Sequence, residues 1–119
     1  MKAIKRPVNI HKAYHAHVYF DDTTKDYARK LCDEVGEKFN LNVGKFHEKL
    51  IGPHLRWSCQ VSFGGNDFAS FIPWLDENRK ELTIFVHGVT GDDLKDHTEH
   101  TMWMGQVKKL NLEMFQSEG

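Results

Sequence analysis

The sequence predicts an α+β fold in which strands and helices follow the order β-α-β-β-α-β. Residues 56–63 alternate apolar and polar side chains, which is the pattern of a strand with one buried face. Residues 24–39 instead place apolar side chains three and four positions apart, as an amphipathic helix does. The chain has 119 residues, and 39% of them are hydrophobic. This length and composition fit one domain with its own core.

The first half of the chain begins with a lead-in without regular structure, residues 1–12. A strand is expected at residues 14–20, where aromatic and β-branched side chains are frequent. Asp21 to Thr24 then offer side-chain oxygens that can cap a helix. That helix is expected at residues 24–39, where the apolar spacing is helical.

Short turns or loops come before, between and after the next two strands. Residues 40–42 form a turn, and a second strand is expected at residues 43–51. Gly52 and Pro53 end it, because proline cannot donate to a strand ladder. The third strand covers residues 56–63, and residues 64–67 then cap a second helix.

The second helix carries its apolar side chains over residues 68–75. Pro73 lies in the middle of this run and lacks the N–H that a helix interior needs. We therefore expect Pro73 in a first helical turn, with residues 68–72 in a preceding bend. A fourth strand is expected at residues 82–87 and a short third helix at residues 94–104.

This order of elements is the split βαβ pattern of ferredoxin-like domains. In that fold the strands lie in the order 4-1-3-2, neighbouring strands are antiparallel, and two helices cover one face of the sheet. A C-terminal helical extension follows. The other face carries Tyr19 and Phe85 and would expose an apolar patch, unless the extension covers it. Such patches tend to be covered, so we expect a homodimer of the α+β barrel type.

The chain contains eight histidines, and the topology brings three of them together. His15 and His17 lie two positions apart in the first strand, so their side chains share a face. On spacing alone, a pair of surface histidines is as good an explanation as half a metal site. His87 ends the fourth strand, which is antiparallel to the first and adjacent to it. The three imidazoles are therefore expected at one corner of the open face, where they could bind a metal.

Other histidines reach the same corner only under stated conditions. His47 reaches it if its side chain faces inward from the second strand. His54 is nominally at the far end of the sheet and reaches the corner only if its loop folds back. For His97 and His100, a solvent-exposed helix face is an equal alternative. His11 belongs to the lead-in and is not expected at the site.

Composition excludes some classes of protein. The 16 basic and 17 acidic residues give a net charge of −1, without the basic footprint of a nucleic-acid binder. We expect no membrane partner either, because no segment is long and apolar enough for a signal peptide or a membrane span. A cytoplasmic location is the simplest expectation. Cys32 and Cys59 are then expected as core thiols rather than a disulfide.

The chain resembles the DOPA 4,5-dioxygenase family of small ring-cleaving dioxygenases over residues 12–106. Several blocks carry the resemblance in the right order: Tyr14-His15-Ala16-His17-Val18-Tyr19-Phe20; Phe46-His47-Glu48-Lys49 with Gly52-Pro53-His54; Trp57-Ser58-Cys59-Gln60-Val61-Ser62-Phe63; and Thr90-Gly91-Asp92-Asp93-Leu94-Lys95-Asp96-His97. Residues 1–119 are accordingly taken as one domain of this kind.

The resemblance implies extradiol cleavage, in which a metal binds both oxygens of a catechol and also binds O₂. The expected metal is Fe(II), and Zn or another divalent metal is an alternative occupant. The expected partners are a small aromatic diol and O₂. Residues are assigned to three roles: His15, His17, His87 and His47 to the metal; His54 and His97 to catalytic proton transfer; Tyr19, Gln60 and Phe85 to substrate contacts. Glu48 and Asp96 are candidate carboxylate ligands.

Two positions depart from the family pattern. Proline is expected after His54 and after His87, whereas this chain has Leu55 and Gly88. Both substitutions lie beside expected site residues and could reshape the pocket. Two other functions remain open on the same fold. One is a non-catalytic metal- or ligand-binding module with a closed coordination sphere. The other is a cofactor-free oxygenase or isomerase that uses histidines as acid–base groups.

Overall fold

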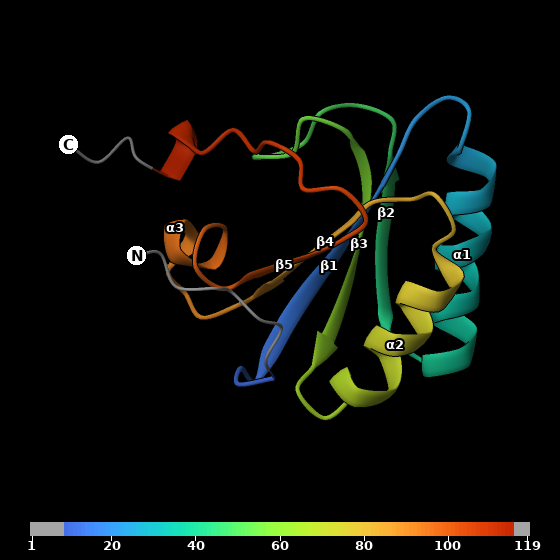
Figure 1. Cartoon of the computed structure of the whole chain (residues 1–119), viewed down its shortest axis with the longest axis horizontal. Coiled ribbons are helices and arrows are strands. Elements are labelled where there is room, and N and C mark those ends of the chain that lie inside the picture. The colour runs from blue at the N-terminus through green and yellow to red at the C-terminus, as the bar shows by residue number, and fades with distance from the viewer. Residues whose placement is uncertain (1–8, 116–119) are drawn as a thin grey trace.

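The computed structural model describes residues 9–115 (Figure 1). The strands are β1 (Ala13–Phe20), β2 (Asn42–His47), β3 (Trp57–Gly64), β4 (Ile84–Gly88) and β5 (Thr101–Met104). The helices are α1 (Lys25–Phe39), α2 (Phe68–Asn78), the four-residue α3 (Asp93–Asp96) and the 3₁₀ turn η1 (Glu113–Phe115). Within the described residues, no helix is long and apolar enough to cross a membrane.

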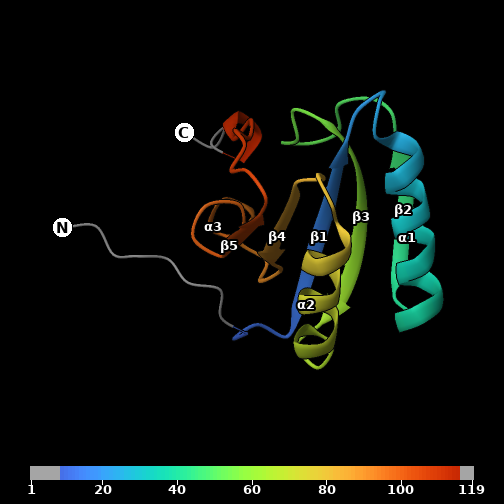
Figure 2. The same cartoon turned by 45° about the vertical axis from the view of Figure 1, so that its right-hand side comes forward.

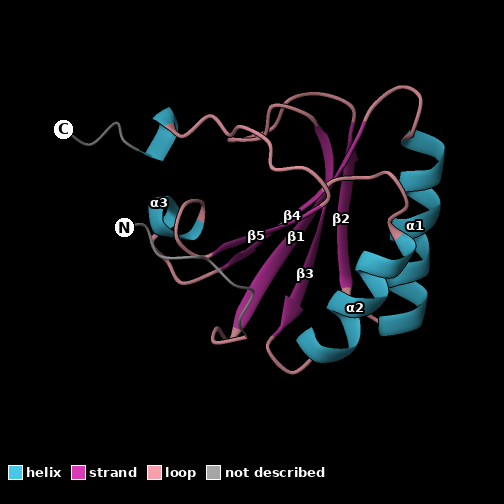
Figure 3. Ribbon diagram, in the orientation of Figure 1, coloured by secondary structure: helices cyan, strands magenta, loops and turns pink. Residues whose placement is uncertain are grey.

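The strands form one antiparallel sheet in the order β2-β3-β1-β4-β5. Helices α1 and α2 pack on one face, and α3 and η1 lie on the other side, as Figures 2 and 3 show. The predicted α+β class is confirmed. The predicted four-stranded sheet is wrong in one respect, because a fifth strand extends the sheet beyond β4.

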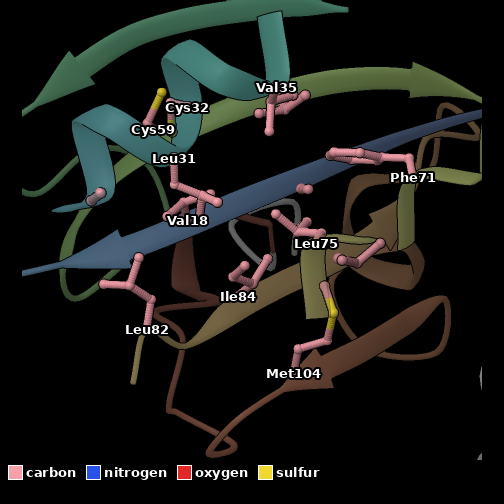
Figure 4. Close-up of a cluster of buried hydrophobic side chains, with 14 of the residues drawn as sticks. Val18, Leu31, Cys32, Val35, Cys59, Phe71, Leu75, Leu82, Ile84 and Met104 are labelled. Atoms are coloured by element: carbon pink, nitrogen blue, oxygen red, sulfur yellow. The ribbon is translucent and has the colours of Figure 1, made fainter. Parts of the chain in front are cut away.

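The strand faces divide as their alternation predicted. Residues from the apolar set of each central strand lie in the core between the sheet and α1 and α2 (Figure 4). They are Ala16, Val18, Phe20, Cys59, Val61, Phe63, Leu82, Ile84 and Val86. Each fully buried Val, Leu or Ile side chain contributes about 1.5–3 kcal/mol of transfer free energy. Both cysteines are buried free thiols in this core, as predicted.

The predicted helix at residues 94–104 is wrong. Helix α3 ends at Asp96, and Thr101–Met104 is strand β5, paired with β4. The pairing places Trp103 beside Phe85, where the two rings stack with centroids 4.5 Å apart. Met104 faces the core instead. Pairing with β4 and burial of alternate side chains therefore make residues 101–104 a strand, although the segment is too short to show a strand pattern in the sequence.

The prediction that Pro73 lies in the first turn of a helix is also wrong. Helix α2 runs from Phe68 through Pro73 to Asn78 without a preceding bend. Pro73 is exposed, so its ring faces solvent. Phe71 and Leu75 on either side of it are fully buried. Their burial outweighs the missing hydrogen bond of the proline.

The second strand is shorter than predicted, because β2 ends at His47 rather than at residue 51. Its pairing with β3 shifts register between Val43 and Phe46, and residues 48–50 are exposed. The remaining elements differ from expectation by up to three residues at their ends. The freed residues form a long loop, residues 48–56, which reaches the face opposite the helices.

The face that was expected to be open is covered by the chain itself. Tyr19 and Phe85 are buried within a single chain. The C-terminal segment crosses this face, and its Leu110 forms an isolated bridge with His54 of the 48–56 loop. This face therefore does not need a second subunit to cover Tyr19 and Phe85, and the homodimer stays a prediction.

Candidate metal centre

Three histidines meet where β1 and β4 pair. His15 lies directly opposite His87 in the ladder, and His17 follows two residues along β1 on the same face. One ring nitrogen from each histidine lies within 4.8 Å of the other two. The three imidazoles therefore converge as the antiparallel register predicted. His17 and His87 are each 4% exposed, whereas His15 is half-buried.

Hydrogen bonding orients the imidazole of His87. Its Nδ1 lies 2.8 Å from the carbonyl oxygen of Gly88. A carbonyl can only accept, so Nδ1 carries the proton and Nε2 carries a lone pair that points away from Gly88. Backbone carbonyls hold metal-binding histidines in this way in many proteins.

The donor set fits a divalent metal ion. Nε2 of His87 lies 3.0 Å from Nε2 of His17. Two nitrogens bound at right angles to one ion, through bonds of about 2.1 Å, lie about 3.0 Å apart. Without an ion, His17 donates this hydrogen bond, because Nε2 of His87 carries no proton. The same two atoms could bind one cation with little movement once the proton of His17 shifts from Nε2 to Nδ1, which frees the second lone pair.

The buried histidines are held in their neutral form. Burial is the largest cause in each case. It lowers the pKa of His87 to about 3 and that of His54 to about 4. It also lowers the pKa of His17 well below its usual value, and the neighbouring imidazoles add to this shift. The pKa of His15 is lowered by burial and by His97. Neutral imidazole is the form that binds metals.

The 48–56 loop folds back and brings His54 to the cluster. The rings of His54 and His17 have centroids 4.1 Å apart. The hydroxyl of Tyr19 lies 2.7 Å from Nδ1 of His54. Burial raises the pKa of Tyr19, so its hydroxyl stays protonated. Tyr19 therefore holds His54 in place.

His97 reaches the cluster from α3. Its Nδ1 lies 2.7 Å from the carbonyl oxygen of Asp93, which can only accept, so Nε2 has a free lone pair. The rings of His97 and His87 have centroids 4.2 Å apart. His97 is half-buried and lines the cavity, so it does not lie on a solvent-exposed helix face, and its catalytic role stays a prediction.

The two candidate carboxylates are engaged elsewhere. Asp96 is buried, and its two oxygens accept from the N–H of Thr90 at 2.8 Å and from its hydroxyl at 2.6 Å. Burial acts to raise the pKa of Asp96, but these hydrogen bonds outweigh it and the pKa is lowered. Glu48 is exposed and pairs with Lys25 at 3.3 Å. The convergent donors of the centre are therefore imidazole nitrogens.

The histidines surround a cavity of about 300 Å³. It is lined by His15, His17, His47, Ile51, Gly52, Pro53, His54, Ser58, Gln60, His87, Val89, Asp93, Asp96, His97, Met114 and Phe115. This volume is at the lower end of the range for small-molecule sites. The cavity is therefore large enough for a small aromatic ring beside the three-histidine cluster.

Some of the other predicted site residues line the cavity and others do not. His47 lines the cavity from the end of β2, but it is not part of the three-histidine group. Gln60 also lines the cavity, whereas Phe85 is fully buried between His17 and Trp103. His11 and His100 contact each other, with ring centroids 4.6 Å apart, and do not line this cavity.

Sequence reasoning missed the contribution of the C-terminal segment. Met114 and Phe115 line the cavity, and the ring of Phe115 stacks on His97 with centroids 4.7 Å apart. No site residue was predicted beyond His100, and residues 116–119 lie outside the described residues. The signal that could have found this wall is the set of apolar residues near the end of the sequence, Leu110, Leu112, Met114 and Phe115.

The fold and the cluster together define a small α+β protein with a candidate metal centre of histidines. The model of the Dopa 4,5-dioxygenase family matches residues 14–114. The chain therefore belongs to the Dopa 4,5-dioxygenase family. This confirms the resemblance seen in the sequence.

Similar proteins agree with this assignment. An uncharacterised 21.2 kDa protein of Botryotinia fuckeliana is 33% identical over 88% of this chain, and a DOPA 4,5-dioxygenase of Amanita muscaria is 30% identical over 85%. The chain spans only 64% and 48% of the lengths of these two relatives. A crystal structure of a "putative dioxygenase" from Nostoc punctiforme superposes with a TM-score of 0.87 and 38% identity, covering 92% of this chain and 95% of that one.

Proposed function

We propose that this protein is a metal-dependent extradiol dioxygenase that opens the ring of a small catechol with O₂. The observation that carries the proposal is the convergence of three neutral imidazoles on a cavity of about 300 Å³. Three protein ligands leave coordination positions for a substrate and for oxygen, as in the non-haem iron sites that bind O₂. Family membership supports the same reaction class.

His15, His17 and His87 would hold the metal. Fe(II) suits the reaction best, since it would allow electron transfer between a catechol and O₂ that are bound at the same site. His47 lines the cavity and could join them, but it stands outside the three-atom group. Backbone pairing of β1 with β4 fixes the spacing of the three imidazoles before any ion binds, so the site is preorganised.

His97 is the best candidate for the base that takes a catechol proton. The carbonyl of Asp93 fixes its tautomer, so Nε2 presents a free lone pair. His54 has its Nδ1 on the hydroxyl of Tyr19 and would position or polarise the diol from another side of the cavity. Gln60 lines the cavity and offers an amide for hydrogen bonding to substrate oxygens.

Anaerobic reconstitution tests the proposal. The purified chain would be loaded with Fe(II), or with Zn as a redox-inactive comparison, and given catechol, 4-methylcatechol and L-DOPA. We expect O₂ uptake and a yellow, ring-opened product with Fe(II) only. Replacement of His87 by Ala should weaken metal binding by more than the roughly 10- to 100-fold typical of losing a residue that supports a ligand. His100→Ala is the matched control, because His100 is not on the cavity wall.

The other outcomes of this experiment separate the alternatives. Full turnover after exhaustive chelation would favour a cofactor-free oxygenase or isomerase. A tightly bound ion with no activity on any catechol would favour a binding module with a closed coordination sphere. A homodimer and a cytoplasmic location remain predictions, and sedimentation analysis of the purified chain decides the first.

A further inference from the structure

The C-terminal segment, residues 106–115, is tied to the loop that carries His54. The backbone N–H of Asn111 donates to the carbonyl oxygen of Pro53 at 2.8 Å. The neighbouring residue, Leu110, forms an antiparallel bridge with His54. The position of this segment is therefore coupled to one wall of the histidine cavity.

The segment ends in a turn that presents Phe115 to the cavity. The N–H of Phe115 donates to the carbonyl oxygen of Leu112 at 3.0 Å, and the side chain of Asn111 accepts from the N–H of Glu113 at 3.2 Å. The ring of Phe115 stacks on that of His97, with an interplanar angle of 29°. The turn thus brings the ring of Phe115 against that of His97, and the contact covers part of the imidazole.

Phe115 also differs in chemistry from its neighbours on the wall. The other lining residues that the structure describes are imidazoles, small polar groups, carboxylates and aliphatic side chains. Among the described lining residues, Phe115 alone carries a benzene ring with its flat apolar face. A flat aromatic substrate packs most favourably against such a face in an offset or edge-on arrangement.

We propose that Phe115 is a positioning and specificity-determining residue of the catechol site. It holds the imidazole of His97 in place, and its ring forms the apolar wall against which the substrate ring packs. The packing of the substrate ring against Phe115 rests on the proposed function, whereas the contact between Phe115 and His97 does not depend on it.

The hold on His97 is tested by chemical modification of the full-length protein as purified. Diethyl pyrocarbonate labels accessible histidines, and fragmentation of the labelled peptide by mass spectrometry resolves His97 from His100. Phe115→Ala should speed labelling of His97 about threefold or more, because one ring that contacts it is removed. Val107→Ala is the matched control, since Val107 is exposed in the same segment and does not line the cavity. Equal labelling rates in Phe115→Ala and the unmodified protein would overturn this half of the proposal.

A second pair of variants tests the tether without touching Phe115. Asn111→Pro removes the backbone donor to Pro53, whereas Asn111→Ala keeps it. We expect faster labelling of His97 in the proline variant than in the alanine variant. Equal rates in the two would show that the tether does not position Phe115.

The role in specificity is tested with catechol and 4-tert-butylcatechol on the iron-loaded protein. Phe115→Ala should raise the KM for catechol about tenfold, with a smaller effect on kcat, and should shift the kcat/KM ratio toward the bulkier substrate. Phe115→Trp should shift it the other way. If the ratio of kcat/KM for the two substrates is unchanged in both variants, Phe115 does not form the wall that selects the substrate. If no catechol is turned over by any form, the proposed function and the wall fail together, and the labelling rates still decide the hold on His97.

Discussion

Gly88 supports the neighbouring His87 through its backbone and through its lack of a side chain. Its carbonyl oxygen fixes the tautomer of His87, and its N–H donates to the carbonyl oxygen of His100 at 2.9 Å. A Cβ at this position would lie 2.6 Å from Cδ2 of His11. The proline expected here from the resemblance would lack the N–H as well as meeting the ring. In this chain, glycine at residue 88 and histidine at residue 11 are therefore matched to each other.

Two alanine substitutions should have opposite effects on stability. Gly88→Ala should lower the free energy of unfolding by about 1–3 kcal/mol, because the ring of His11 must move out of a packed position. Gly36→Ala should raise it by about 0.5–1 kcal/mol, since Gly36 lies inside α1 and its nearest neighbour is at an ordinary 3.6 Å. Urea unfolding of both variants measures this. A Gly88→Ala protein as stable as the parent would contradict the packing argument.

Which site residues could be predicted follows from where each one sits. His15, His17 and His87 lie on regular strands, where alternation and register determine the positions of side chains. His54 could not be placed, because its position depends on the path of the loop and on the hydrogen bond to Tyr19. Phe115 was missed because nothing periodic marks the segment that carries it.

Helix α3 is only four residues long, so its position depends on side-chain contacts rather than on helix propensity. Asp92 caps it by accepting from the N–H of Lys95 at 3.1 Å. Buried Asp96 ties its last turn to Thr90 through two hydrogen bonds. These contacts place His97 over the cluster. The sequence did not show that the helix ends at Asp96 and gives way to an edge strand.

Asp96→Asn should destabilise the protein. Asn presents one oxygen to the two donors of Thr90 and turns an N–H₂ group toward the other donor, so a charge-assisted hydrogen bond is lost. We expect a decrease of about 1.5–3 kcal/mol in the free energy of unfolding, measured by chemical denaturation. Asp76→Asn is the control, because Asp76 forms an exposed ion pair with Arg79 and should change stability by less than about 0.5 kcal/mol. Similar effects of the two substitutions would show that α3 is held by other contacts.

At the scale of the whole molecule, the covered face explains both what was predicted and what was not. The α+β class and the core followed from strand alternation and helical spacing, which local side-chain pattern encodes. The covering of the second face depends on residues 106–115 and on the 48–56 loop, which have no regular structure to detect beyond a single turn. Their placement follows from a few long-range contacts, such as the hydrogen bond from Asn111 to Pro53.

The metal-free protein should lose stability as the pH falls below neutrality. The pKa of His87 is about 3 and that of His54 about 4 in the folded chain, both below the ordinary value of 6.5. The unfolded chain therefore takes up protons first, and folding stability is lost as the pH falls from about 6.5 toward these values. Each histidine contributes a slope of up to about 1.4 kcal/mol per pH unit.

Denaturant unfolding in the presence of a chelator, from pH 7 to pH 4.5, measures this slope. His87→Asn removes one of the titrating groups and should reduce the slope by about one histidine's share. A free energy of unfolding that stays constant over this pH interval would contradict the burial of neutral imidazoles.

A centre built from imidazole nitrogens alone has a consequence for how the protein is handled. Neutral nitrogen donors follow the Irving–Williams series, so Cu²⁺ and Ni²⁺ compete well against Fe²⁺ for the same positions. The ion recovered with the protein will then depend on which of these metals the growth medium and the purification column supply. Under the proposed function, specific activity should accordingly be expressed per mole of bound iron, since a preparation filled from a nickel resin would be inert while being correctly folded.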